Sequence, residues 1–322
     1  MNCTIGVVVA TYNGERFIET QLLSIINQTK HPNEIIVSDG CSADNTIQIA
    51  KKILSEHDIP YRILTSDKRL SVSQNFQKGL SACETDYIFF SDQDDMWLEN
   101  KIERTLLSIE EDCSLIFTNA YIADENLNYN GSTLWQQIGY RTDARTKKYS
   151  KGDLSFYKLL IKHNVVTGMC MCISSTIKPF AIPFPDGVIH DYWIAFVGIS
   201  TGSVISINEP LTLYRQHGNN VVGTTTNLRK SYSKKDRYLN DIIAKEKMIT
   251  QVLELIKHEN LRIPYGIVTQ YKDYLDKKIQ YITSRQLFPV PSLSDYYKYE
   301  YKMGRIVIRD IFTKVRTLVA RG

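Results

Sequence analysis

The sequence has no hydrophobic run as long as a transmembrane helix, and no basic segment precedes a short apolar stretch at its start. We therefore expect no membrane span and no signal peptide. The six cysteines form no CxxC pair and no zinc-ligand spacing, which favours reduced thiols in a cytoplasmic protein. Neither GxGxxG nor GxxxxGK[ST] occurs, which excludes dinucleotide-fingerprint and P-loop chemistry.

The net charge of +4 is unevenly distributed along the chain. Residues 229–322 contain 20 Lys and Arg against 10 Asp and Glu, whereas residues 1–228 contain 19 against 25. An acidic body with a basic tail predicts that the tail meets something anionic. We expect no nucleic-acid partner.

The last part of the tail, residues 303–319, has an amphipathic pattern. Its apolar residues share one helical face, with basic residues on both flanks, as in a helix that lies in an anionic membrane surface. The alternative is that this face docks on the protein's own body or on a second copy. The apolar residues are Ile308, Ile311, Phe312, Val315, Leu318 and Val319.

Strand-like apolar runs alternate with helical periodicity in the first 91 residues. This alternation predicts βαβ units, an α/β fold and a mostly parallel sheet. The expected strands are 5–10, 34–38, 61–64 and 87–91, with a helix between each pair. Further along we expect a helix over 97–112, strands at 115–118 and 165–174, a long loop over 121–152, a buried helix at 193–199, and a strand pair at 204–207 and 211–214.

Three carboxylates, Asp92, Asp94 and Asp95, follow directly after the buried strand 87–91. Open α/β sheets bind ligands beyond the carboxyl ends of their strands. Carboxylates this close repel one another unless a cation lies among them, and hard oxygen ligands suit Mg²⁺ or Mn²⁺. The stretch predicts a metal site for a phosphorylated ligand; the alternative is an acidic turn that caps the next helix. The same edge is expected to carry Thr11-Tyr12-Asn13 and Asp39.

These stretches resemble the motifs of the inverting family 2 glycosyltransferases with the GT-A fold. The branch most similar builds bacterial surface polysaccharides and is often labelled rhamnosyltransferase. The resemblance covers about residues 4–222, and its motifs are Thr11-Tyr12-Asn13-Gly14, Asp39-Gly40, Ser91-Asp92-Gln93-Asp94-Asp95-x-Trp97, His190-Asp191-x-Trp193 and Arg215-Gln216-His217-Gly218-Asn219-Asn220.

The resemblance implies a role for each matching residue. On the donor side, Thr11 and Asp39 would contact the nucleobase, beside Tyr12 and Asn13, and Asp92 would hold the ribose. Asp94 would bind a metal that bridges the diphosphate, with Asp95 beside it and His217 approaching once the following loop closes. Asp191 would be the general base, and the remaining residues expected to bind substrate are His190, Trp193 and Arg215. His190 stands where many relatives have a second acidic residue.

The implied reaction moves a sugar from a nucleotide donor to a glycan. A divalent cation would stabilise the leaving diphosphate, and a carboxylate would take the proton of the acceptor hydroxyl, with inversion at the anomeric carbon. The first choice of donor is dTDP-L-rhamnose, with a UDP-hexose as the alternative, and the acceptor is a lipid-linked glycan on the inner face of the plasma membrane. Residues 1–115 would form the nucleotide-sugar half of a domain 1–228, 116–228 its acceptor and catalytic half, and 229–322 a basic helical extension.

Three other functions fit parts of the sequence. A sugar-phosphate nucleotidylyltransferase needs a loop rich in glycine and basic residues after the first strand, and residues 11–15 lack it. An aspartyl phosphohydrolase would want Thr or Ser where Met96 stands. A non-catalytic assembly subunit would not need Asp92, Asp94 and Asp191 together.

Overall fold

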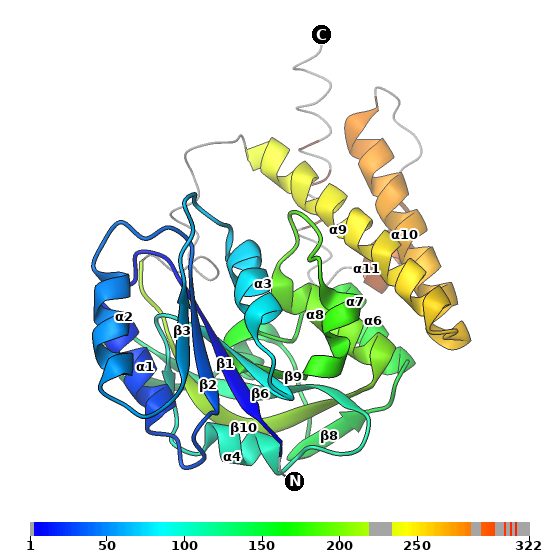
Figure 1. Cartoon of the computed structure of the whole chain (residues 1–322). Coiled ribbons are helices and arrows are strands. Elements are labelled where there is room, and N and C mark those ends of the chain that lie inside the picture. Colours follow the sequence, from blue (N-terminus) through cyan, green and yellow to red (C-terminus); the bar gives the residue numbers. More distant parts are fainter. Residues whose placement is uncertain are drawn as a thin grey trace. The chain divides into compact units, whose positions relative to one another are not determined.

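The structure is a computed structural model that describes residues 3–218, 234–284 and 291–299, together with Ile306, Asp310 and Thr313. The chain divides into two compact units (Figure 1). Unit 1 comprises Met1–Lys151, Val165–Phe184 and Ile189–Asn227; unit 2 comprises Gly152–Asn164, Pro185–Val188 and Leu228–Gly322. Apart from those three single residues, the tail helix expected over 303–319 lies outside the described part of the chain, as do Asn219 and Asn220. No helix within the described ranges is long and apolar enough to cross a membrane.

Unit 1 is built on one sheet, with strand order β3-β2-β1-β4-β9-β6-β10-β5, while β7 pairs with β6 and β8 with β10. Strands β1 to β4 pair in parallel, as do β6 and β10, and the other strands join antiparallel. The predicted α/β class and mostly parallel central sheet are confirmed. The strands are β1 (Ile5–Thr11), β2 (Glu34–Asp39), β3 (Tyr61–Leu64), β4 (Tyr87–Asp92), β5 (Met96–Trp97), β6 (Cys113–Ala123), β7 (Tyr129–Thr133), β8 (Thr146–Tyr149), β9 (Met171–Ser174) and β10 (Ser203–Arg215).

Helices cover both faces of this sheet, because alternate side chains of a central strand point to opposite sides. Val7 and Val9 of β1 share a buried cluster with Leu22 of α1 and Leu54 of α2. Figure 1 shows α1 and α2 on one side of the first strands and α3 on the other. The helices of unit 1 are α1 (Ile18–Ile26), α2 (Thr46–Ser55), α3 (Val72–Ala82), α4 (Lys101–Leu106), α5 (Leu134–Ile138), α7 (Lys178–Ala181) and α8 (His190–Thr201), with short 3₁₀ turns η1 (Gly168–Cys170) and η2 (Ser175–Ile177).

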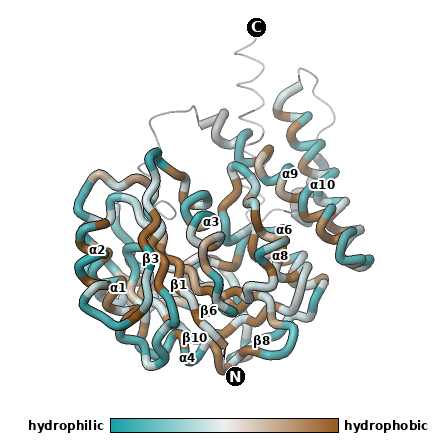
Figure 2. Tube along the Cα trace, in the orientation of Figure 1, coloured by the Kyte–Doolittle hydropathy of each residue, from teal (hydrophilic) through white to brown (hydrophobic). Residues whose placement is uncertain are grey.

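Helix α3 approaches the opposite face of the sheet closely because residue 79 is glycine. A Cβ at Gly79 would lie 2.4 Å from Cγ1 of Val8, so any larger residue would push the helix away. Phe76 of α3 packs against Phe90 of β4 on this face, with ring centroids 5.4 Å apart. Figure 2 shows that hydrophobic residues concentrate on the central strands, while the outward turns of α1 and α2 are largely hydrophilic.

Four expectations about elements differ from the structure. The helix expected from Trp97 is the shorter α4, because Trp97 itself pairs with β10 as part of β5. The expected strand 165–174 contains the turn η1, and only its last four residues form β9. The expected strand pair after residue 203 is one long strand, β10, with register shifts on either side of Pro210. The expected loop over 121–152 contains β7, α5 and β8.

Unit 2 consists of helices in its described part: α6 (Leu154–Lys162), α9 (Lys234–His258), α10 (Arg262–Thr283) and α11 (Leu293–Tyr299). Figure 2 shows hydrophobic and hydrophilic residues alternating along α10, as expected of a helix with one buried face. Among the described residues of this unit, a buried ion pair joins Lys278 Nζ and Asp310 Oδ2, which are 3.5 Å apart and almost inaccessible to solvent. Tyr238 donates its hydroxyl to Asp310 Oδ1, and Lys278 Nζ donates to the Tyr274 hydroxyl at 3.2 Å.

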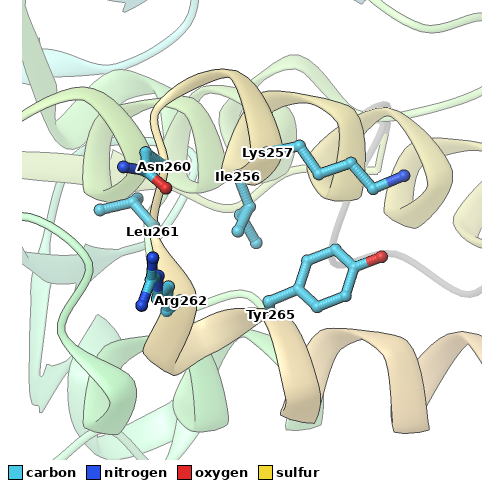
Figure 3. A pocket seen from close by; sticks show the side chains of 6 residues that line it. All are labelled: Ile256, Lys257, Asn260, Leu261, Arg262 and Tyr265. Carbon is cyan, nitrogen blue, oxygen red and sulfur yellow. The ribbon is translucent and has the colours of Figure 1, made fainter.

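An open hollow of about 320 Å³ lies at the turn between α9 and α10 (Figure 3). Its lining residues include no carboxylate, so it offers no ligands for a hard cation. They are Ile256, Lys257, Asn260, Leu261, Arg262 and Tyr265.

Candidate active site

The carboxyl ends of β1, β2 and β4 meet at one edge of the sheet, as the sequence predicts. Thr11 is in register with Asp39, and Ala10 with Asp92. The polar loops that follow these strands are therefore neighbours, although they lie far apart in the sequence. We call this part of the molecule the carboxyl edge.

Asp39 shapes the loop after β2. Its Oδ1 accepts hydrogen bonds from the hydroxyls of Thr11 (2.8 Å) and Ser42 (2.6 Å). Its Oδ2 accepts from the backbone N–H groups of Cys41 (3.1 Å) and Ser42 (2.8 Å). Four donors occupy the carboxylate, which is 2% exposed, so Asp39 organises the loop around its own side chain.

The loop after β1 is held by side chains from its neighbours. Gln93 accepts from the N–H of Tyr12 (2.8 Å) and donates back to the Tyr12 carbonyl (3.1 Å). Asn13 has a positive φ of 47°, a conformation that asparagine tolerates, and its Oδ1 accepts from Ala43 N at 2.8 Å. The Tyr12 ring lies 4.6 Å from the Arg69 guanidinium. These contacts fix an aromatic ring and an amide beside the loop that Asp39 shapes.

Asp92 and Asp95 are crowded carboxylates with raised pKa values. Burial, followed by the charges of Asp94 and Asp191, raises the pKa of Asp92 to about 7, and Lys101 opposes this shift. Burial, followed by the charges of Asp94 and Asp92, raises the pKa of Asp95 well above its ordinary value. Asp95 Oδ1 accepts from the N–H of Arg215 at 3.1 Å, while Oδ2 is buried without a hydrogen-bond partner among the described residues.

His217 is placed directly on Asp94, with Nε2 and Oδ2 2.8 Å apart. The imidazole stacks on Phe17 at a centroid distance of 4.6 Å. The guanidinium of Arg215 also lies over the Phe17 ring, with 4.8 Å from Cζ to the ring centroid. Its Nε donates to the Asp94 carbonyl at 2.6 Å. The end of β10 is therefore fastened to the turn that contains Asp92, Asp94 and Asp95 at the end of β4, which we call the acidic turn.

Asp191 lies in the first turn of α8 and is 8% exposed. Its Oδ2 accepts a hydrogen bond from the N–H of Gly168, in η1, at 3.1 Å. Because the charge of Asp191 contributes to the raised pKa of Asp92, the two carboxylates are electrostatic neighbours. The structure thus brings the expected base into range of the carboxyl edge.

His190 and Trp193 are core residues, which differs from their expected role as substrate-binding side chains. The His190 ring is 4% exposed and packs against Phe76 and Phe90, with centroid distances of 4.2 and 5.9 Å. Burial lowers its pKa to about 3, and neither ring nitrogen has a hydrogen-bond partner within the described residues. Trp193 is 4% exposed and donates its indole N–H to the Ala181 carbonyl at 2.7 Å. Substrate contact by either ring would require the packing to open.

Two residues of this region were given no site role from the sequence. Asn75 of α3 donates to the Thr11 carbonyl (2.9 Å) and accepts from Ser38 Oγ (2.8 Å), which joins the ends of β1 and β2. Lys101 is 1% exposed and lies near the acidic turn. A lysine four residues after Trp97, at the start of a helix that follows three carboxylates, is the pattern that could have suggested it.

The residues at the carboxyl edge fit a divalent cation that takes few ligands from the protein and most from water and substrate phosphates. Asp94 and His217 are adjacent. Asp95 was expected to lie beside them, but it is 1% exposed and its carboxylate is turned toward the backbone of β10. Within the described residues no three Asp, Glu, His or Cys side chains converge as a ligand set. Mg²⁺ usually takes one or two carboxylates and completes its shell with water and substrate phosphates. The buried, unpartnered Oδ2 of Asp95 and the raised pKa of Asp92 show the excess negative charge that such a cation would neutralise.

Solved structures similar to this chain have the GT-A fold. Residues 1–349 of S. aureus TarS in complex with UDP-GlcNAc match 98% of this chain and 89% of that chain with a TM-score of 0.63, at 13% identity. The mannosyltransferase PcManGT from Pyrobaculum calidifontis, in complex with GDP-Man and Mn²⁺, matches 99% of this chain and 86% of that chain with a TM-score of 0.51, at 12% identity. At these identities the likeness concerns the fold alone.

The sequence itself shows the family. The dTDP-rhamnosyl transferase RfbG of Shigella flexneri is 30% identical over 245 residues, which cover 70% of this chain and 77% of that protein. The model of the family described as Glycosyl transferase family 2 matches residues 6–167, half of the chain. The protein therefore belongs to glycosyl transferase family 2.

Proposed function

We propose that the protein is an inverting, metal-dependent hexosyltransferase that moves L-rhamnose from dTDP-rhamnose to a growing, lipid-linked surface glycan. The observation that carries the proposal is the arrangement of carboxylates. Asp92 ends β4 at the carboxyl edge and Asp94 follows it in the next turn. Asp191, about a hundred residues away in sequence, lies near enough to raise the pKa of Asp92. A sugar transfer needs this pairing of a diphosphate side and a base side.

The donor nucleoside is proposed to bind in the loops after β1 and β2. Asp39 and Thr11 hold the shape of the loop, and Tyr12 and Asn13 offer a ring and an amide beside it. Asp92, which is half-buried at the end of β4, is the residue proposed to hold the ribose. The excess of carboxylates here disfavours a bare diphosphate, so the donor would bind together with a cation.

Asp94, with His217 adjacent, is the residue proposed to hold Mg²⁺ or Mn²⁺ against the diphosphate. The cation would act as a Lewis acid for the charge that develops on the leaving nucleoside diphosphate. Arg215 contributes by fixing the Asp94 backbone through its bond to the carbonyl, while Phe17 supports the His217 ring. The Mn²⁺ in the PcManGT structure supports this assignment by analogy of fold.

Asp191 is proposed to take the proton of the acceptor hydroxyl. The Gly168 N–H orients its carboxylate and stabilises the ionised form that a base needs. The rival base, His190, is enclosed by two phenylalanine rings and has a pKa lowered to about 3, so it has no route to an acceptor as folded. In this scheme the acceptor hydroxyl attacks the anomeric carbon as the nucleoside diphosphate leaves, and this single displacement inverts the anomeric centre.

The similarity to the rhamnosyl transferase RfbG supports the choice of donor. A UDP-hexose is the alternative, supported by the UDP-GlcNAc bound in the TarS structure. We further propose that the basic tail brings the enzyme to the cytoplasmic face of the membrane, where a lipid-linked acceptor would be available.

The test is a donor panel: nucleoside diphosphate release from dTDP-rhamnose, UDP-glucose, UDP-GlcNAc and GDP-mannose, each with Mg²⁺ or Mn²⁺ and a lipid-linked glycan acceptor. We expect acceptor-dependent release from dTDP-rhamnose. Preference for a UDP-hexose would establish the alternative donor. No release from any donor, by protein whose folding is verified, would overturn the proposal.

A further inference from the structure

Lys101 is a buried ammonium with only neutral hydrogen-bond acceptors. It is 1% exposed, and its Nζ donates to the carbonyl of Met169 at 2.5 Å and to Thr212 Oγ1 at 2.7 Å. The Trp97 ring lies beneath it, with 4.1 Å from Nζ to the centroid. Burying a charge in this way is costly unless opposite charge lies nearby.

Part of the compensation for burying Lys101 comes from the acidic turn. Burial lowers the pKa of Lys101 to about 8, and Cys170, Asp95, Cys172 and Asp92 oppose this shift in that order. Lys101 in turn lowers the pKa of both carboxylates. With a pKa of about 8 the lysine is mainly a cation at neutral pH. Its hydrogen bonds go to neutral acceptors, while Asp92 and Asp95 act on it electrostatically.

The two hydrogen bonds of Lys101 join the two sides of the candidate active site. Met169 follows Gly168, whose N–H holds the Asp191 carboxylate. Thr212 lies on β10, three residues before Arg215, which holds the Asp94 carbonyl and Asp95 Oδ1. The Lys101 ammonium thus connects two segments. One is the backbone next to the proposed base Asp191, and the other is β10, which holds the acidic turn.

We propose that Lys101 is a positioning residue for sugar transfer, which sets the base-side backbone against the acidic turn and supplies a fixed positive charge near Asp92 and Asp95. The proposal rests on the proposed function. A misplacement of about 1 Å in an active site can cost on the order of 100-fold in rate, so losing this connection should reduce turnover without abolishing donor binding.

The chain offers a matched control. Lys278 is also buried, at 2% exposed, and donates to a tyrosine hydroxyl, but it belongs to unit 2 and is paired with Asp310. The experiment compares Lys101→Met, Lys101→Arg and Lys278→Met in the full chain. It measures Tm, the kcat and KM for the donor, and calorimetric binding of the nucleoside diphosphate with Mn²⁺.

We expect Lys101→Met to lower kcat about 100-fold while the donor KM and nucleotide affinity change less than about threefold. Lys101→Arg, which keeps the charge, should recover at least about tenfold of that loss. Lys278→Met should lower Tm at least as much as Lys101→Met, with kcat within about twofold of the wild type. A purely structural role for Lys101 would instead make the two Met variants alike in kcat.

A folded Lys101→Met protein with kcat within threefold of the wild type would overturn the proposal. If Lys101→Met fails to fold, Thr212→Val tests the proposal in its place, because it removes one hydrogen bond of Lys101 and keeps the charge. It should lower kcat severalfold at nearly unchanged Tm, and unchanged kcat would overturn the proposal. If the wild-type chain releases no nucleoside diphosphate from any donor, the proposed function fails instead, and the two failures are thereby distinguished.

Discussion

The two units bury charge in opposite ways. In unit 2 the buried carboxylate, Asp310, has an ammonium and a phenol as partners. At the carboxyl edge of unit 1, Asp92 and Asp95 crowd each other and Asp94, and their pKa values rise accordingly. Removing one partner of a buried, compensated pair destabilises the fold, because the other charge is left buried without a partner. A cluster of like charges instead lacks the opposite charge that a bound cation would supply. The contrast separates the residues expected to control activity from those expected to control folding.

The largest effect is expected at Asp94. Asp94→Ala should reduce sugar transfer about 1000-fold, since metal stabilisation of the leaving group is worth several kcal/mol. Tm should not fall, because the substitution removes one of three mutually repelling charges. The measurement is nucleoside diphosphate release with and without EDTA, beside a thermal melt. Full wild-type activity in excess EDTA would show that the cluster is not a catalytic metal site.

The matching change in unit 2 should act on stability alone. Asp310→Ala leaves Lys278 buried without its ion pair, and breaking such a pair costs about 3 kcal/mol or more. Urea unfolding followed by circular dichroism should show this loss, while kcat of the folded protein stays within about twofold. A loss of turnover as large as that of Asp94→Ala would remove the distinction drawn between the units.

Asp191→Asn is expected to slow sugar transfer at least ~100-fold, the usual scale of a lost general base. The amide keeps the shape of the side chain and still accepts a hydrogen bond from Gly168, but it cannot take a proton. Binding of donor and metal should change less than about threefold by calorimetry. His190→Gln is measured beside it: if that variant is inactive while Asp191→Asn turns over normally, the base is not Asp191.

The smallest effect concerns pH and His190. The pKa of His190 is about 3 in the folded protein and 6.5 ordinarily, because burial disfavours the charged ring. Below pH 6.5 the unfolded chain therefore binds a proton that the folded chain does not. The free energy of unfolding is then highest above about pH 6.5 and decreases as the pH falls toward 3. At pH 5 the loss is about 2 kcal/mol. The difference in unfolding free energy between His190→Gln and the wild type should therefore shift by about 2 kcal/mol in the variant's favour from pH 7.5 to pH 5. A difference that does not change with pH would mean that folding does not lower the pKa of the ring.

The fold of the first half could be predicted because its strands are continuous apolar runs, each followed by a polar loop. The register that brings Thr11, Asp39 and Asp92 to one edge follows from parallel pairing alone. Elements from residue 96 onward were harder, because Trp97 and Pro210 sit in short or irregular strand pairings that local periodicity does not encode.

The site residues divide in the same way. Residues at strand ends, such as Asp94, could be placed from the sequence, whereas the inward orientation of Asp95 depends on a backbone N–H from β10, 120 residues away. The burial of His190 depends on Phe76 and Phe90 from two other elements. Lys101 is an extreme case, since its partners Met169 and Thr212 come from distant segments and a lysine is ordinarily exposed.

The most direct test of the central claim is calorimetric titration of Mn²⁺, in the presence of dTDP or UDP, into the wild type, Asp94→Asn and Asp310→Asn. The account predicts that the wild type and Asp310→Asn bind the metal–nucleotide pair with the same affinity, while Asp94→Asn binds it at least about tenfold more weakly. Equal affinity for all three proteins would contradict the claim that the carboxyl edge is a cation-dependent nucleotide-sugar site.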